Sequence, residues 1–171
     1  RMEAHFTRRI EVLPDDTRTW LLIMAAEQSD DAMWRRQAAV DLGLDPGADA
    51  AAVDAGLIEP GPRARFRHPL IRTVAYESQL RSDRARLHRR LASTIERDGP
   101  GTPDENAALI ATHLECADDL TAAFAWHMRA GNWLTLRDLA AARASWQRSR
   151  QVAELLPPDA PGRLSMLIET G

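Results

Sequence analysis

The feature that most constrains the fold is a junction at residues 63–76, where a short alternating stretch runs into a proline-initiated helix. Residues 63–67 alternate basic and apolar side chains, which predicts a β-strand with one exposed face. Proline is favoured at the first position of a helix, because its missing N–H would have no partner there. Pro69 therefore predicts a helix start with His68 at or next to the N-cap, and the free N–H groups of a helix start can bind phosphate.

Three helices are predicted before this strand. Apolar spacing over residues 2–12 indicates an amphipathic helix, and Asp15 or Asp16 is predicted to cap the next one. A third helix is predicted to begin at residues 29–31 and to stop at Gly43. The apolar side chains expected to line the second and third helices are Trp20, Leu21, Met24, Ala25, Met33, Trp34, Ala38 and Leu42.

A β-hairpin is predicted after a fourth, short helix over residues 48–55. Its strands are Leu57 to Glu59 and residues 63–67, and the Pro-Gly-Pro sequence between them is a tight turn. Helices followed by a two-stranded wing are the element order of a winged helix. The sequence therefore predicts a winged-helix domain over residues 1–80.

A connecting helix and linker are predicted over residues 81–101. Ser82 is a candidate cap for this helix, and Leu87, Leu91 and Ile95 recur every four residues along it. The helix is expected to end at Asp98-Gly99-Pro100-Gly101, because two glycines and a proline cannot continue it.

Helical hairpins are predicted over residues 102–171. Thr102, Pro103 and Glu105 form a capping-box pattern, and Asp118-Asp119 and Asp138 are predicted to start two further helices. Small alanines with single aromatic residues at helical spacing allow helix pairs to approach closely. The expected fold class is thus mainly α, with a small two-stranded wing followed by antiparallel helical hairpins.

The string Phe-x-His-Pro-Leu-x-Arg-x-x-x-Tyr, from Phe66 to Tyr76, resembles the winged-helix part of bacterial signal-transduction ATPases with numerous domains. In these regulators a nucleotide-binding module precedes the winged helix, and a helical array follows it. The strings Ala-Trp-His-Met-Arg-Ala and Ser-Trp-x-x-Ser-Arg resemble the start of the tetratricopeptide-like array in LuxR-type and adenylate-cyclase-linked members. The resemblance implies ADP or ATP bound by the parent protein, and an inducer or partner at the array.

His68 is similar in context to the histidine of the Met-His-Asp motif in plant and animal relatives, which touches the β-phosphate of bound ADP. Here the flanking residues are Arg67 and Pro69. The resemblance implies that His68 senses a nucleotide held by a neighbouring module of the same parent chain. The plain alternative is that His68 only caps its helix.

Two further classes of function remain open from the sequence. One is a protein-interaction scaffold. The other is DNA binding through Arg63, Arg65 and Arg67 on the wing. Asp49 and Asp54 argue against the second, because the helix at the recognition position carries these acids and no Arg, Asn, Gln or Ser to read a base edge.

Charge is concentrated in one block of the sequence. Residues 63–90 hold nine arginines against two acidic residues, whereas both flanks are net acidic. Its six basic residues at 81–90 fit either an anion-binding patch or a solvated, ion-paired helix face. Part of this charge is expected to face the nucleotide-binding module. The run comprises Arg81, Arg84, Arg86, His88, Arg89 and Arg90.

Composition excludes several kinds of chemistry. The chain has no lysine, so no P-loop, Schiff-base or kinase lysine is present. No catalytic constellation or glycine-rich phosphate loop is recognisable, and we expect a non-catalytic fragment without a cofactor of its own. His113 and Cys116 have a spacing suited to metal, but no further ligands accompany them, so His113 and His127 are interpreted as packing residues and Cys116 as an apolar filler.

The chain is expected to be a cytoplasmic piece of a longer protein. The single cysteine cannot form an internal disulfide, which fits a reducing compartment. No apolar run approaches the roughly 20 residues of a membrane-spanning helix, so no membrane partner is expected. The chain begins at Arg1 and ends at Gly171 just after an apolar run, which suggests excision from a larger protein.

Overall fold

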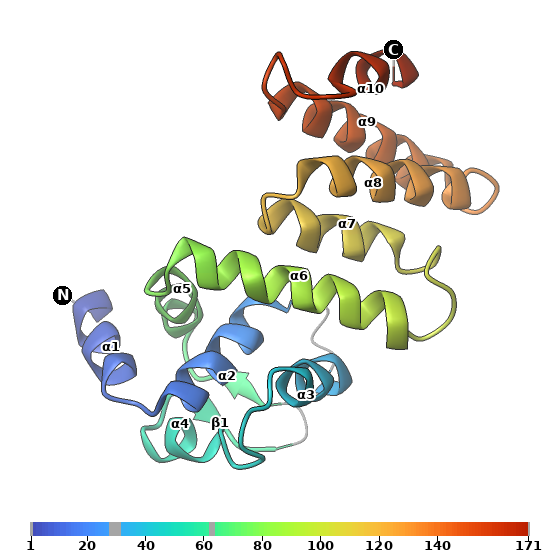
Figure 1. The fold of residues 1–171 in the computed structure, drawn as a ribbon. Coiled ribbons are helices and arrows are strands. Elements are labelled where there is room, and N and C mark those ends of the chain that lie inside the picture. Colours follow the sequence, from blue (N-terminus) through green and yellow to red (C-terminus); the bar gives the residue numbers. More distant parts are fainter. Residues whose placement is uncertain (1, 28–31, 62–63, 171) are drawn as a thin grey trace. The chain divides into compact units, whose positions relative to one another are not determined.

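The computed structural model describes residues 2–27, 32–61 and 64–170. These residues form ten helices and one two-stranded antiparallel sheet, so the expected mainly helical class is confirmed (Figure 1). Tertiary contacts divide the chain into an N-terminal unit, residues 1–87, and a C-terminal unit, residues 88–171. The boundary lies inside α6 (Arg81–Asp98), between Leu87 and His88.

The N-terminal unit contains five short helices and the sheet. Strand β1 pairs with β2 in an antiparallel register that places Ile58 opposite Phe66 and Glu59 opposite Arg65. The predicted hairpin is present, although each strand has only two residues. The elements are α1 (Met2–Glu11), α2 (Asp15–Ala26), α3 (Ala32–Asp41), α4 (Ala50–Asp54), β1 (Ile58–Glu59), β2 (Arg65–Phe66) and α5 (Pro69–Glu77).

One hydrophobic core holds this unit together, and large aliphatic side chains supply most of it. Helix α5 contacts both α1 and α2 around this core, and the buried Leu57 and Ile58 bring β1 against it. Most of the expected apolar positions are buried or half-buried, but Met33 is 52% exposed and does not belong to the core. The fully buried members include Ile10, Leu21, Leu57, Ile58 and Ile71.

Helix starts in this unit were predicted with mixed success. His68 is the N-cap of α5 with Pro69 at the first helical position, as predicted. The prediction that Asp15 or Asp16 caps α2 is wrong, because Pro14 is the N-cap and no side chain bonds the free N–H groups. The Asp15 carboxylate pairs with Arg18 instead. The predicted start of α3 at residues 29–31 lies outside the described residues.

The start of α6 also differs from the prediction. The helix begins at Arg81, so Ser82 is already inside its first turn and does not cap it. Its end at Asp98, before the Gly-Pro-Gly sequence, is as predicted. Leu87, Leu91 and Ile95 are all buried, which confirms the expected apolar face.

The C-terminal unit is a series of antiparallel helices that follow the second part of α6. Figure 1 shows α7, α8 and α9 side by side, and contacts join α7 to α8 and α8 to α9. Asp119 and Asp138 cap α8 and α9 by accepting hydrogen bonds from the N–H groups of Ala122 and Ala141, as predicted. The helices are α7 (Ala107–Cys116), α8 (Leu120–Leu134), α9 (Leu139–Leu155) and α10 (Arg163–Glu169).

The predicted capping box at the start of α7 is formed, but it lies one turn before the helix. Thr102 N–H donates to the Glu105 carboxylate, and Glu105 N–H lies 3.4 Å from Thr102 Oγ1. Residues 103–106 form turns, and the regular helix begins at Ala107 with Asn106 as its N-cap.

Candidate functional site

His68 lies on the exposed surface of the N-terminal unit, between β2 and α5. Its backbone is extended (φ −147°, ψ 138°), and its Nδ1 accepts a hydrogen bond from the N–H of Leu70 at 3.1 Å. Because Nδ1 is the acceptor, the neutral ring carries its proton on Nε2. An exposed imidazole at the positive end of a helix dipole thus presents an outward N–H donor, which is a suitable environment for an anion.

Phe6 of α1 contacts the His68 ring. The two ring centroids are 6.2 Å apart and the planes are inclined by 29°, which is a stacked arrangement. Phe6 is itself half-buried against the hydrophobic core. The capping bond and the stacking together fix the orientation of the imidazole, and no pattern in the sequence predicts the contact with α1.

The arginines predicted to lie on a wing are partly described. Arg65 on β2 and Arg67 are exposed, whereas Arg63 lies outside the described residues. The backbone N–H of Arg67 donates to Leu57 O at 3.1 Å, which extends the pairing of the wing towards His68. Arg67 directly precedes His68 in the chain, so the segment before α5 carries positive charge.

The acids that argued against DNA binding also have defined positions. Asp54 on α4 is exposed and Asp49, the N-cap of α4, is half-buried. Helix α4 has only five residues. It offers a short, acidic surface rather than a basic helix for a groove.

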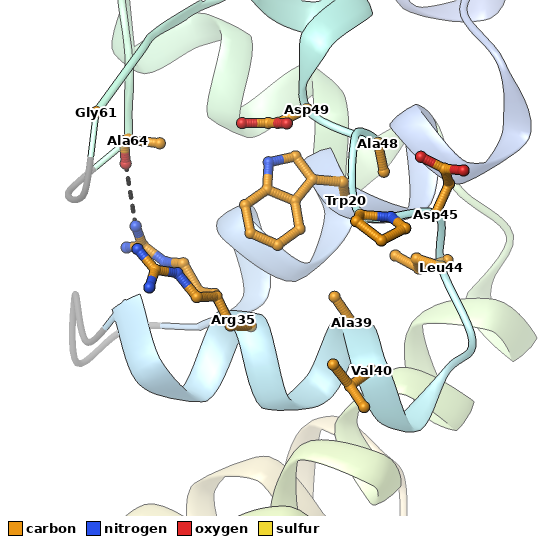
Figure 2. Close-up of a pocket in the computed structure, with 12 residues that line it drawn as sticks. Trp20, Arg35, Ala39, Val40, Leu44, Asp45, Ala48, Asp49, Gly61 and Ala64 are labelled. Carbon is orange, nitrogen blue, oxygen red and sulfur yellow. Dashed lines mark hydrogen bonds between the residues drawn. The ribbon is translucent and has the colours of Figure 1, made fainter.

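A cavity of about 320 Å³ opens elsewhere in the N-terminal unit (Figure 2). Trp20 of α2 stands in the middle of its lining residues, with apolar side chains of α3 and of the segment before α4 around it. Its indole Nε1 is buried and has no hydrogen-bond partner among the described residues. His68 is not among the lining residues, so the cavity and the imidazole are separate features.

A buried charged side chain joins α3 to the residue before β2 at one end of this cavity. Arg35 is 5% exposed, and its Nη1 donates to the carbonyl oxygen of Ala64 at 3.0 Å. Its Nε lies 3.7 Å from a carboxylate oxygen of Glu27, which is 1% exposed. No local sequence pattern predicts this ion pair, because Glu27, the C-cap of α2, and Arg35 of α3 meet only in the folded chain.

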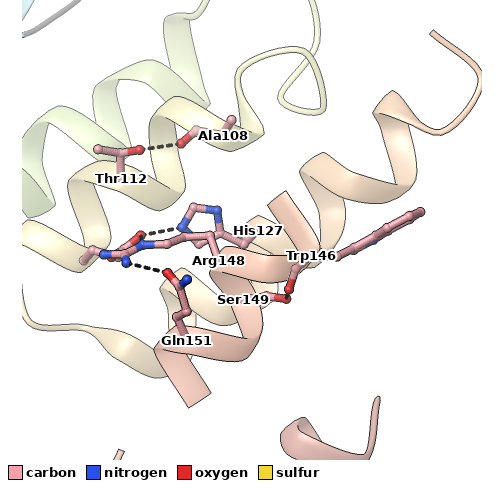
Figure 3. A network of polar contacts seen from close by, with 8 residues as sticks. Ala108, Thr112, His127, Trp146, Arg148, Ser149 and Gln151 are labelled. Carbon is pink, nitrogen blue, oxygen red and sulfur yellow. Dashed lines mark hydrogen bonds and ion pairs between the residues drawn. The ribbon is translucent and has the colours of Figure 1, made fainter. Parts of the chain in front are cut away.

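The C-terminal unit contains a polar network across three helices (Figure 3). His127 Nε2 on α8 donates to Glu115 Oε1 on α7 at 2.6 Å, and Arg148 Nε on α9 donates to the same oxygen at 3.0 Å. Burial of Glu115 raises its pKa, but the hydrogen bonds from His127 and Arg148 and the charge of Arg148 outweigh burial and lower the pKa overall. Glu115 is therefore ionised, and its carboxylate links α7 to α8 through His127 and to α9 through Arg148.

A second polar pair is deeper in this unit. His88 Nδ1 and His113 Nδ1 are 2.9 Å apart, and each ring is 1% exposed. Burial, with the neighbouring His88 as a second cause, lowers the pKa of His113 to about 3. The His113 ring is thus neutral near pH 7, and in this contact one Nδ1–H donates a hydrogen bond to the Nδ1 of the other ring. His113 was expected only as a packing residue, and His127 likewise, so their specific partners were missed.

Cys116 and the basic run are less specialised than these groups. Cys116 is exposed as a residue, so its interpretation as an apolar filler is wrong. Partial desolvation of its thiol, with Glu115 as the next cause, still raises its pKa. In the described part of the chain no cluster of three metal-ligating side chains is present. Arg84 lies over the Tyr76 ring at 4.9 Å and Arg89 donates to Ala117 O, which favours the solvated, paired interpretation of residues 81–90.

No family model, no curated protein and no solved structure matches this chain. Among the described helices none combines the length and apolar character needed to cross a membrane. The function is therefore argued from the residues of the chain and their geometry.

Proposed function

We propose that the chain is a non-catalytic regulatory part of a multidomain, nucleotide-dependent signalling protein. The N-terminal unit acts as a winged helix that contacts the phosphate of bound ADP through His68, and the helical hairpins of the C-terminal unit receive an inducer or partner. The nucleotide itself is held by another module of the parent protein, since this chain has no lysine for a P-loop.

The single observation that carries the proposal is the state of the His68 ring. It is exposed, its Nδ1 is used by the Leu70 N–H, and its Nε2–H remains to donate outward. A ring buried within its own unit would have excluded contact with a phosphate from another module. The element order of helices, wing and α5 supports the winged-helix part of the proposal.

Regulation would follow from differential affinity. A unit that contacts ADP stabilises the resting state, and exchange of the nucleotide removes that contact. An inducer at the hairpins shifts the same equilibrium only if it binds one state more tightly than the other.

The test compares two substitutions of His68 in the full-length parent protein. His68→Asn keeps an acceptor for the cap, since Asn is a preferred N-cap residue, but removes the Nε2–H donor. His68→Ala removes both. A charge-assisted hydrogen bond contributes about 1.5–3 kcal/mol, so both variants should lose ADP about 10- to 100-fold more readily and show raised basal activity.

The measurement is the ADP content of the purified protein, with stability followed by thermal unfolding. His68→Asn should unfold near the wild-type temperature, whereas His68→Ala loses about 1 kcal/mol from the missing cap. Wild-type ADP content in His68→Asn would show that His68 only caps α5.

A protein-interaction scaffold is the second candidate. It is favoured by α10, where Leu164 and Ile168 are each 72% exposed and no residue of the helix is buried. The coding sequence before residue 1 separates the two candidates, because only the nucleotide-sensing proposal requires a glycine-rich P-loop with lysine in the parent.

A further inference from the structure

The cavity around Trp20 has the form of a small-molecule site. Its volume of about 320 Å³ is at the lower end of the range for ligand pockets, roughly 300–1,000 Å³. Ala39, Val40 and Leu44 supply apolar walls, and the Trp20 ring supplies a flat aromatic surface. Apolar walls with a few polar groups are typical of sites that bind a compact ligand.

Two charged groups of opposite sign line the same cavity. Arg36 and Asp49 have no hydrogen-bond or ion-pair partner among the described residues. Arg35 differs from Arg36, because its guanidinium is already engaged by Ala64 and by Glu27. A free cation and a free anion at one apolar cavity are an arrangement that a ligand can complete.

The two signs of charge come from different sides of the cavity. Figure 2 shows Arg35 and Asp45 on opposite sides of the Trp20 ring, and Arg36 is the neighbour of Arg35 on α3. A purely anionic ligand would meet Asp45 and Asp49, and a purely cationic ligand would meet the arginine side. Like charges placed together oppose binding, so neither single-sign ligand suits the cavity.

We propose that this cavity binds a small zwitterion with an apolar body, the chemistry of a free apolar α-amino acid. Its carboxylate pairs with Arg36, its ammonium group pairs with Asp49, and its apolar side chain lies against Trp20 and the walls from α3. This site is independent of the phosphate contact at His68, and it gives the N-terminal unit a ligand of its own.

The experiment titrates the ¹⁵N-labelled chain with L-phenylalanine and with L-leucine, and follows the tryptophan indole N–H signals by NMR. Five tryptophans are present, so the Trp20 signal is assigned with Trp20→Phe. A saturable shift of the Trp20 signal with at least one of the two amino acids is expected, with the Trp126 signal unchanged. No saturable shift with either amino acid overturns the proposal.

Blocked analogues separate the two charges. N-acetyl-L-phenylalanine lacks the ammonium group and L-phenylalaninamide lacks the carboxylate, and each should bind at least tenfold more weakly than L-phenylalanine. Equal affinity for all three compounds would mean nonspecific apolar binding and would overturn the proposal.

Substitutions test which residues bind the carboxylate and the ammonium group of the ligand. Arg36→Gln should weaken L-phenylalanine and the N-acetyl compound while leaving the amide unchanged, and Asp49→Asn should do the reverse. Arg90→Gln, an exposed arginine of the C-terminal unit, is the matched control and should have no effect. Retention of the Trp34 indole signal verifies that the variants are folded. An unchanged ligand preference in both pocket variants contradicts the assignment.

Discussion

The two units bury different kinds of side chain. Large aliphatic residues such as Ile10, Leu57 and Ile71 supply most of the core of the N-terminal unit. Between α7, α8 and α9 the buried residues are mostly small or polar. They include Ala111, Ala123, Ala130, Ala142, Ala153, Ser145, Ser149, His113 and His127.

This difference separates two sources of stability. Large aliphatic side chains stabilise a fold through the apolar area that they remove from water. Small residues let helices approach closely, and their own contribution of area is modest, so close fit and buried hydrogen bonds carry more of the stability. We therefore expect the stability of the N-terminal unit to fall when buried side chains are made smaller. The stability of the C-terminal unit should fall when buried side chains are made larger and when the pH is lowered.

The largest expected effect is a loss of volume in the N-terminal unit. Leu57 is fully buried, so Leu57→Ala should lower the free energy of unfolding by about 2–5 kcal/mol. Urea unfolding followed by the indole signals of Trp20 and Trp34 measures it. The matched control is Leu164→Ala on α10, where the side chain is 72% exposed, and its effect should stay within about 0.5 kcal/mol. A loss below 1 kcal/mol for Leu57→Ala would contradict the comparison.

An added methyl group should destabilise the C-terminal unit. A Cβ at Gly131 would overlap the indole of Trp146, so Gly131→Ala should cost about 1–3 kcal/mol through overpacking. The Trp126 and Trp133 signals report the unfolding of this unit.

A second substitution tests the cause of that loss. In a Trp146→Leu background the overlap is removed, and Gly131→Ala should become neutral or stabilising by up to about 1 kcal/mol, because alanine has the higher helix propensity. The same cost in both backgrounds would show that the indole is not responsible.

The smallest expected effect is a dependence on pH. Because the pKa of His113 is lowered to about 3 from an ordinary value near 6.5, the unfolded chain binds more protons between these values. The stabilisation is complete above pH 6.5 and is lost as the pH falls. Between pH 7 and pH 5.5 the loss from this group should be about 1.3 kcal/mol.

The contribution of His113 to this pH dependence is separated from that of Glu115 by the pH range and by a substitution of His113. The carboxylate of Glu115 has a lowered pKa, so the stability that it adds is lost only at lower pH, as it titrates in the folded state. His113→Leu should show a change between pH 7 and 5.5 that is smaller by about 1.3 kcal/mol than in the wild type. Equal changes in the two proteins would mean that the buried pair does not carry the effect.

Signals that lie next to each other in the sequence predicted the fold best. The caps at His68, Asp119 and Asp138 were predicted, because a capping side chain and the N–H that it binds are two or three residues apart. The prediction that Asp15 caps α2 is wrong for an equally local reason, because its carboxylate pairs with Arg18 and not with a free N–H group.

Features that depend on tertiary packing were not predictable. The partners of His113 and His127 are 25 and 12 residues away, and no periodic pattern connects them. The division of the chain inside α6 likewise follows from tertiary contacts, because the helix itself is continuous across it. The Trp20 cavity likewise depends on three segments that meet only in the folded chain.

The glycine at position 131 also determines how α8 and α9 are aligned along their length. Trp146 fits where α8 has no side chain, and sliding by one helical turn, about 5.4 Å, would bring the indole against His127 or Thr135 instead. One missing methyl group therefore selects a single alignment from several that the alanine-rich surfaces alone would permit.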